Sequence, residues 1–231
     1  MLHSTLARIY PSFCILCERP THKSFICTAC RGDMPVNRHA CRLCAMPLSN
    51  PDADICGLCL KKPPVFDAAR SFYLYRQPLI WMIQQLKYHA KLEYAELLAN
   101  LIQLQIGAGH NKPDCIIPVP LHPAKCQQRG FNQATQIIKP VAQQQDIPVD
   151  TRLCRRVLNT GSQSGLDKKQ RRKNIKNAFV VNSAHHYQSV VVFDDVMTTA
   201  STVTELTRCL KRAGVSEVEI WSLARAETKH D

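Results

Sequence analysis

Short apolar runs predict the strands of a buried sheet. Residues 190–193 are four consecutive apolar residues, three of them β-branched, between polar neighbours. This pattern is typical of a strand buried on both faces of a parallel sheet. Residues 115–119 form a second such run, in which Pro118 indicates either a position at the sheet edge or a terminating bulge. Residues 68–75 and the alternating residues 218–223 predict two further strands.

Between these runs the apolar residues recur at helical spacing. Residues 79–104 predict two helices with a break near residues 88–91. Residues 120–130 are expected to form a polar, basic loop, and a helix of roughly fourteen residues, bent near Pro140, is expected to open at residue 129. Strands that alternate with helices predict an α/β domain with a mostly parallel sheet.

A further helix is predicted to begin at Thr202. Thr202 and Glu205 fit the Thr-x-x-Glu capping box, in which each side chain accepts a hydrogen bond from the backbone N–H of the other residue. Gly214 suits the position just beyond the end of this helix, where a left-handed conformation is common.

The segment after residues 190–193 carries the candidate chemistry. Asp194 and Asp195 follow the strand directly, at the carboxyl end where open α/β sheets bind ligands. Their carboxylates suit ribose hydroxyls, or a Mg²⁺ that accompanies a diphosphate. The loop that follows leads to a helix start, whose amides and dipole suit a phosphate. This expected phosphate loop comprises Val196, Met197, Thr198, Thr199, Ala200, Ser201 and Thr202.

Four Cys-x-x-Cys pairs precede the α/β pattern. Two such pairs make a closed tetrahedral site, which is the structural kind of zinc site. A redox role would require a thioredoxin-like βαβ pattern around the cysteines, and the sequence has none there. The spacing favours sequential pairing and leaves an interleaved pairing open. The predicted ligands of two structural Zn²⁺ ions are Cys14, Cys17, Cys27, Cys30, Cys41, Cys44, Cys56 and Cys59.

Residues 61–64, Lys-Lys-Pro-Pro, mark the expected domain boundary, because proline ends regular structure and the cysteine pairs stop just before it. We therefore expect a double zinc ribbon over residues 1–62 and the α/β domain over residues 63–231. No run approaches the ~18 apolar residues of a membrane span, and residues 1–13 lack the apolar core of a secretory signal. The protein is expected to be soluble and cytoplasmic.

The chain is basic, with a formal net charge of +12 over its 231 residues. Zinc-bound thiolates would reduce this to about +8, which is still compatible with a polyanionic partner. Nine basic residues and one acid fall within residues 152–176. They could face a phosphorylated ligand, a nucleic-acid backbone or water. The candidate nucleic-acid contacts among them are Arg155, Arg156, Lys168, Lys169, Arg171, Arg172 and Lys173.

Residues 190–202 resemble the phosphoribosyl-pyrophosphate (PRPP) signature of type I phosphoribosyltransferases. The resemblance implies that the α/β domain has the Rossmann-like fold of that group. It also implies that Asp194 and Asp195 contact the ribose 2′- and 3′-hydroxyls, that residues 196–202 wrap the 5′-phosphate, and that Mg²⁺ binds together with PRPP. Ala200 departs from the usual glycine, which would strain the loop if this residue has a positive φ.

Residues 116–134 closely match the ComF family, through Ile-Ile-Pro-Val-Pro-Leu-His-Pro and then Arg-Gly-Phe-Asn-Gln-Ala. Leu86-Lys87-Tyr88 also resembles a motif of that family, although spacing alone predicts that Lys87 is a surface lysine. In related transferases the loop after this strand faces the pyrophosphate, so Arg129 and Gly130 are candidates for that contact. The alternative is that Arg129 is a surface residue at a helix start.

The family resemblance implies a role in natural competence, with handling of incoming single-stranded DNA and contact with the competence machinery. In this hypothesis the PRPP-type site binds a ligand or regulates the protein. The alternative is an active phosphoribosyltransferase that transfers ribose 5-phosphate from PRPP to an unidentified acceptor, with the two aspartates and Mg²⁺ stabilising an oxocarbenium-like state. No residue stands out as a general base. A P-loop triphosphatase is excluded, because the sequence has no Gly-rich segment that ends in Gly-Lys-Ser or Gly-Lys-Thr.

Overall fold

The computed structural model describes residues 12–21, 25–107, 112–159, 175–182 and 185–227. The chain divides into two compact units, residues 1–35 and residues 36–231. The cysteine pairs at 41/44 and 56/59 therefore lie in the larger unit, together with the α/β fold, whereas the sequence suggested a boundary after residue 62. Among the described residues, none of the helices is both long and apolar enough to cross a bilayer.

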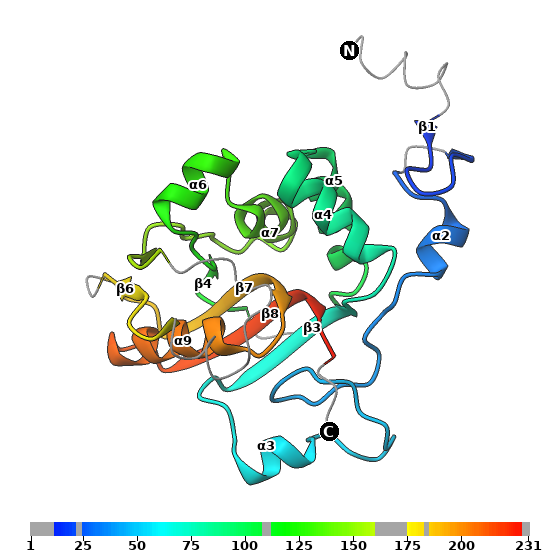
Figure 1. The fold of residues 1–231 in the computed structure, drawn as a ribbon. Helices are drawn as coiled ribbons and strands as arrows, with labels where there is room; N and C mark the ends of the chain where they lie inside the picture. Colours follow the sequence, from blue (N-terminus) through cyan, green and yellow to red (C-terminus); the bar gives the residue numbers. More distant parts are fainter. Residues whose placement is uncertain (1–11, 22–24, 108–111, 160–174, 183–184, 228–231) are drawn as a thin grey trace. The chain divides into compact units, whose positions relative to one another are not determined.

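A four-stranded parallel sheet forms the centre of the larger unit and confirms the predicted fold class (Figure 1). All three neighbouring strand pairs are parallel. β4 lies at one edge, which is the first of the two alternatives that Pro118 indicated. Across the sheet the strands are β3 (Ala68–Leu74), β8 (Glu217–Arg225), β7 (Ser189–Met197) and β4 (Cys115–Pro118).

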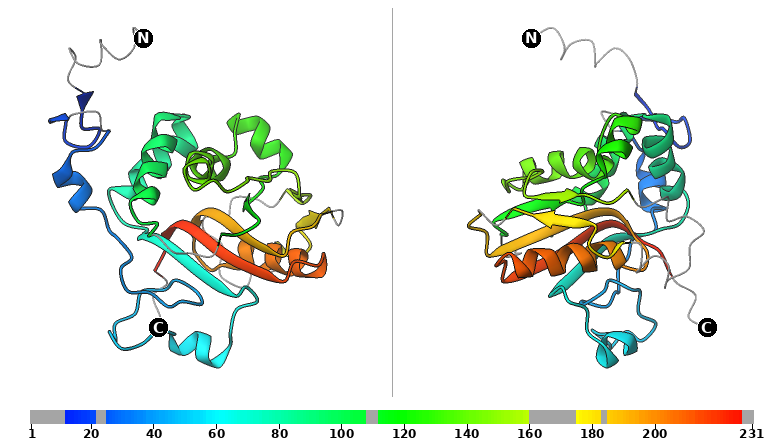
Figure 2. Two further views of the ribbon diagram at one scale, coloured as in Figure 1. Left: turned by 180° about the vertical axis from the view of Figure 1, so that it is seen from behind. Right: turned by 60° about the vertical axis from the view of Figure 1, so that its left-hand side comes forward.

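Helices cover both faces of this sheet (Figure 2). On one face lie α4 (Leu79–His89), α5 (Glu93–Gln103) and α7 (Gln133–Gln144), and on the other lies α9 (Ser201–Arg212). The apolar face of α9 packs with alternate residues of β7 in one buried cluster. The predicted break between the two helices of residues 79–104 is confirmed, because α4 ends at Ala90 in a left-handed conformation.

The expected loop over residues 120–130 is wrong for most of its length. Residues Pro123–Arg129 form a helix, α6. His122 caps this helix through a hydrogen bond from the Ala124 amide, and Pro123 occupies its first turn, where a missing N–H costs nothing. Gly130 ends it with a φ of 83°, so the next helix, α7, starts only at Gln133 with Asn132 as its cap.

The predicted capping box at Thr202 is also wrong. Helix α9 begins at Ser201, and Ala200 occupies the cap position with no side-chain hydrogen bond. Glu205 does not bind the helix start, because its carboxylate accepts a hydrogen bond of 2.9 Å from the Asn177 amide. Glu205 therefore anchors the segment that precedes β6 (Phe179–Val181), a strand that pairs in antiparallel fashion with β5 (Cys154–Arg156).

The smaller unit contains short elements around the first two cysteine pairs. They are the strands β1 (Ser12–Phe13) and β2 (Pro20–Thr21), which pair with each other, and the helix α2 (Thr28–Gly32). Its few buried residues include Cys14 and Ile26. In the larger unit the last cysteine pair lies around the start of a similar short helix, α3 (Gly57–Lys61).

Candidate functional site

A cavity of about 320 Å³ opens at the carboxyl end of β7. Strand β7 continues to Met197, whereas its neighbour β4 stops beside Phe193. The difference in length leaves the final residues of β7 free to line a cavity on the β4 side. This is the edge at which open parallel sheets bind ligands. The lining residues are Tyr75, Lys87, Val119, Leu121, Lys125, Gln133, Arg156 and the continuous segment 194–203.

A buried polar network fixes the second aspartate of the cavity. Asp195 is 3 % exposed, and its carboxylate forms an ion pair with the ammonium group of Lys87. Gln133 donates to the other carboxylate oxygen at 3.1 Å. Arg129 in turn donates to the side-chain oxygen of Gln133. The network joins α4, α6, α7 and β7, so the fold sets the position of this carboxylate before any ligand binds.

The two adjacent carboxyl groups have opposite pKa shifts. Burial, together with the neighbouring Asp195, raises the pKa of Asp194 to about 7. Burial also acts to raise the pKa of Asp195, but the Lys87 ammonium and the hydrogen bonds from Lys87 and Gln133 outweigh it, so the net pKa is lowered. Asp195 is therefore the permanently charged partner of Lys87, and Asp194 is the group that a bound cation or diol would ionise near neutral pH.

The phosphate loop turns sharply at Ala200, which has φ 57° and ψ 11°. This left-handed conformation is the one that glycine adopts without strain. Immediately beside it, the hydroxyl groups of Thr199 and Ser201 lie 2.8 Å apart and form a hydrogen bond. The sequence predicted strain at Ala200 if its φ is positive, and its φ is positive.

Replacing Ala200 by glycine is expected to raise the free energy of unfolding by about 0.5–1 kcal/mol. The change removes left-handed strain of about 1–2 kcal/mol and adds unfolded-state entropy of about 0.4–1 kcal/mol. Ala213→Gly is the matched control, because Ala213 ends the same helix with φ −85° and is not strained. Urea denaturation of both variants checks this, and equal destabilisation by the two changes would contradict a strained loop.

Three cationic side chains face the two aspartates in the cavity. They are Lys87, Lys125 and Arg156, from α4, α6 and β5. Burial lowers the pKa of the Lys125 ammonium, and the nearby Arg156 and Arg129 lower it further. Burial likewise lowers the pKa of Arg156. Cations that are crowded and partly dehydrated gain most from an anionic ligand, so this side of the cavity suits phosphate oxygens.

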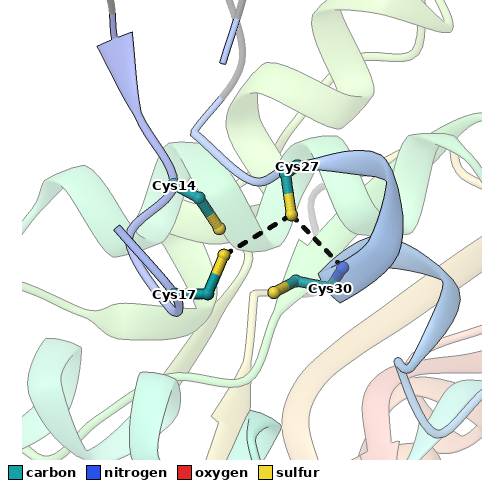
Figure 3. Close-up of side chains that lie close together, drawn as sticks. All are labelled: Cys14, Cys17, Cys27 and Cys30. Atoms are coloured by element: carbon teal, nitrogen blue, oxygen red, sulfur yellow. Dashed lines mark hydrogen bonds between the residues drawn. The ribbon is translucent and has the colours of Figure 1, made fainter. Parts of the chain in front are cut away.

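The first four-cysteine cluster comprises Cys14, Cys17, Cys27 and Cys30, whose sulfurs point toward one another (Figure 3). The sulfurs of Cys17 and Cys27 lie 3.6 Å apart. A tetrahedral zinc with Zn–S bonds of about 2.3 Å requires sulfurs about 3.8 Å apart. Burial alone would raise the pKa of Cys14, but hydrogen bonds from the amides of Cys27, Leu16 and Cys17 lower it to about 6. The donor set and its spacing therefore fit a structural Zn²⁺.

The second cluster has the same construction. Its ligands are Cys41, Cys44, Cys56 and Cys59, and the sulfurs of Cys44 and Cys56 lie 3.7 Å apart. Burial acts to raise the pKa of Cys41, but the amides of Cys56, Leu43 and Cys44 lower it to about 7. The first two cysteine pairs thus form one site and the last two pairs form the other, which confirms sequential pairing and excludes the interleaved arrangement.

The remaining predicted site residues have different placements. The segment Asp194–Thr202 and Arg156 line the cavity, whereas Arg129 and Gly130 are not among its lining residues. Arg129 contacts Gln133 of the cavity lining through a hydrogen bond, and its contact with pyrophosphate stays a prediction. Arg155 is exposed on β5. The other candidate nucleic-acid contacts lie outside the described residues: Lys168, Lys169, Arg171, Arg172 and Lys173.

Lys87 is the principal site residue that spacing alone did not identify. It was predicted to be a surface lysine, but its side chain is only 19 % exposed and pairs with Asp195. The available signal was its place in Leu86-Lys87-Tyr88 at the end of a helix that follows the first strand of the sheet. Gln133 and Lys125 were not predicted either, because their roles depend on how α6 and α7 are placed above β7.

Two four-cysteine clusters combined with a parallel α/β fold and a carboxylate-lined cavity define a zinc-ribbon protein with an α/β domain. Residues 5–60 match the double zinc ribbon domain family. The DNA utilization protein YhgH of Salmonella typhimurium is 34% identical over 93% of this chain and 97% of its own length. Competence protein F of Haemophilus influenzae is 34% identical over 92% of this chain and 96% of its own length. The chain belongs to this ComF family.

A more distant relative matches over a similar share of the chain. Competence protein ComFC of Bacillus subtilis is 24% identical over 94% of this chain and 97% of its own length. Among solved structures, the glutamine phosphoribosylpyrophosphate amidotransferase of B. subtilis matches 61% of this chain and 30% of that chain, with a TM-score of 0.42 and 14% identity. This last likeness is too remote to bear on function.

Proposed function

We propose that the protein is a cytoplasmic competence or DNA-utilization factor of the ComF family whose α/β domain binds a PRPP-type ligand together with Mg²⁺. The names of its relatives, competence protein F and DNA utilization protein YhgH, support the biological role. The observation that carries the ligand is the cavity at the end of β7, where two carboxylates and three cations surround a turn that leads into a helix.

Each part of this cavity has a counterpart in the proposed ligand. The carboxylates of Asp194 and Asp195 suit the ribose diol or Mg²⁺. The 5′-phosphate would lie against residues 196–202, where the amides at the start of α9 point outward. Lys125 and Arg156 suit the diphosphate. Mg²⁺ would supply charge neutralisation of the diphosphate when bound.

Calorimetric titration with PRPP, with and without Mg²⁺, tests this proposal. Saturable binding is expected for the wild type, and Asp194→Asn is expected to weaken it at least about tenfold, as the loss of one charge-assisted contact implies. Because burial raises the pKa of Asp194 to about 7, affinity should also fall between about pH 8 and about pH 6 as the carboxylate gains a proton.

Asp146→Asn is the matched control for that titration, since its side chain is 97% exposed and is not among the residues that line the cavity. A folded, zinc-loaded wild type that binds no PRPP would overturn the ligand assignment.

Exchange of pyrophosphate into PRPP in the presence of candidate nitrogen bases then separates ligand binding from transferase activity. Detectable exchange would favour the alternative function, an active phosphoribosyltransferase.

A basic groove beside the cavity supports the DNA-handling part of the proposal. The groove has a volume of about 790 Å³ and shares Thr199 and Ser201 with the PRPP-type cavity. Two acidic side chains near the groove form ion pairs with its cations, Glu205 with Arg208 and Asp67 with Lys211. The cations that line the groove are Lys62, Lys176, Arg208, Lys211 and Arg212.

The double variant Lys176→Ala/Arg212→Ala is expected to bind single-stranded DNA more weakly. If both residues contact phosphates, the slope of log affinity against log salt concentration should become shallower by about 1.4, since each contact contributes about 0.7. Arg76→Ala/Lys112→Ala removes the same charge from exposed ion pairs elsewhere and serves as the control. Fluorescence anisotropy across a salt series measures both. An equal change of slope in the two double variants would remove the groove from the interface.

A further inference from the structure

Arg225 joins the second cysteine cluster to the phosphate loop. It is the last residue of β8 and lies beside Met197, the last residue of β7. Its guanidinium donates from Nε to the carbonyl oxygen of Cys44 at 3.0 Å. From Nη1 it donates to the carbonyl oxygens of Met197, at 2.8 Å, and of Thr198. One planar group therefore contacts the backbone of a metal ligand and the first turn of the loop.

This guanidinium is buried without a carboxylate partner. Arg225 is 5% exposed, and none of the ion pairs among the described residues includes it. A buried cation without compensation is costly. The second cluster lies directly beside the guanidinium, whose Nε contacts the backbone of its ligand Cys44. Four thiolates around one Zn²⁺ carry about two negative charges in excess, which is enough to balance Arg225.

The second cluster is also attached to the sheet by its backbone. The backbone amide of Ala69 donates a hydrogen bond of 3.0 Å to the carbonyl oxygen of Arg42. The backbone amide of Asn37 donates one of 3.1 Å to the carbonyl oxygen of Phe72. Ala45, which follows Cys44, is fully buried in the same apolar cluster as Met197 and Val203. A change in the geometry of this cluster therefore acts directly on residues that support the loop.

We propose that Arg225 is a positioning residue for the phosphate loop and that it makes the loop conformation depend on the metal in the second cluster. That the positioned loop receives a phosphate rests on the proposed function. The charge of the metal-loaded second cluster keeps the guanidinium in place. The guanidinium in turn fixes the carbonyl groups of Met197 and Thr198 by hydrogen bonds. The amides that follow are thereby oriented toward the cavity. Loss of the metal would leave Arg225 without its counter-charge and release the loop. The first cluster belongs to the other compact unit.

Hydrogen exchange of the segment 194–203 tests the proposal without any ligand. In the zinc-loaded full chain, Arg225→Met is expected to accelerate exchange of these amides about tenfold, because local opening becomes easier. Arg225→Lys keeps the charge but cannot bridge three carbonyl groups, so an intermediate effect is expected. Cys44→Ser should accelerate exchange in the same segment, and Cys17→Ser in the first cluster should not.

A second measurement keeps the proposal testable if Arg225→Met does not fold. The fraction of zinc that the second cluster releases to a competing chelator at equilibrium should rise in Arg225→Lys, with its zinc affinity lowered severalfold, since the coupling free energy between two sites is reciprocal. Unchanged exchange and unchanged zinc release in Arg225→Lys would overturn the proposal, as would equal effects of Cys17→Ser and Cys44→Ser on the loop. A wild type that binds no PRPP would contradict the proposed ligand and leave these two readouts intact.

Discussion

Lys87→Met is expected to destabilise the protein by about 3–5 kcal/mol and to abolish measurable binding of the proposed PRPP-type ligand, because it leaves a buried carboxylate without its cation. Asp195 is 3% exposed and has Gln133 as its other hydrogen-bonding side chain. Methionine retains the length and the apolar stem of lysine, so the loss of charge is isolated from a loss of packing. Urea denaturation monitored by far-ultraviolet circular dichroism measures the change in the free energy of unfolding.

The pH dependence of this effect follows from the direction of the pKa shift. Lys87 lowers the pKa of Asp195, so the pair contributes stability above the unfolded pKa of aspartate, about 3.9, and this contribution is lost as the pH falls through the lowered folded value. In Lys87→Met the pKa of Asp195 should instead rise. The stability difference between wild type and variant should therefore be larger at about pH 8 than at about pH 5.

The double variant Lys87→Met/Asp195→Asn provides the control. Removing both charges should restore most of the stability, because a neutral amide needs no cation, whereas ligand binding should stay lost. If Lys87→Met unfolds at the same urea concentration as the wild type, the ion pair does not stabilise the fold and this prediction is contradicted.

Removal of zinc is expected to unfold the two clusters unequally. The described residues between 12 and 35 have few buried side chains, so the folding of this unit depends on a metal whose binding supplies about 10–16 kcal/mol. Residues 36–62 retain backbone hydrogen bonds to β3 and a fully buried Ala45. A strong chelator should therefore expose residues 12–35 first, and the second cluster should loosen only at higher chelator concentration or temperature.

Limited proteolysis with mass spectrometry, during a chelator titration, distinguishes these stages. Re-addition of Zn²⁺ should restore the protection of residues 12–35. Cys27→Ser should reproduce the first stage without chelator, because it removes one of four ligands from the first cluster. Persistent protection of residues 12–35 in the metal-free protein would refute a structural zinc in that cluster.

Local patterns in the sequence predicted the sheet and the donor atoms well. The β-branched run of residues 190–193 identifies the central strand because burial on both faces requires such residues. Cys-x-x-Cys pairs identify metal ligands because a single turn places both sulfurs on one ion. Both patterns depend only on neighbouring residues in the sequence, so they can be recognised without knowledge of the tertiary structure.

The parts that were missed depend on tertiary contacts. Thr202 and Glu205 have capping-box spacing, but Glu205 is drawn to the Asn177 amide, so the helix begins earlier without a side-chain cap. Lys87 resembles any lysine on a helix until α4 is placed over the end of β7. The pairing of Arg225 with Cys44 joins residues 181 positions apart, and no local pattern encodes it.

The position of the second cluster has a consequence for how the sequence can change over generations. The double zinc ribbon match spans residues 5–60, yet the sequence boundary between the two compact units falls after residue 35. Substitutions in residues 36–62 must stay compatible with β3, β8 and Arg225, and are expected to co-vary with them among descendants. Substitutions in residues 12–35 are constrained mainly by the need to bind the metal of the first cluster. One inherited domain is thus under two separate sets of constraints, and its halves are free to diverge at different rates.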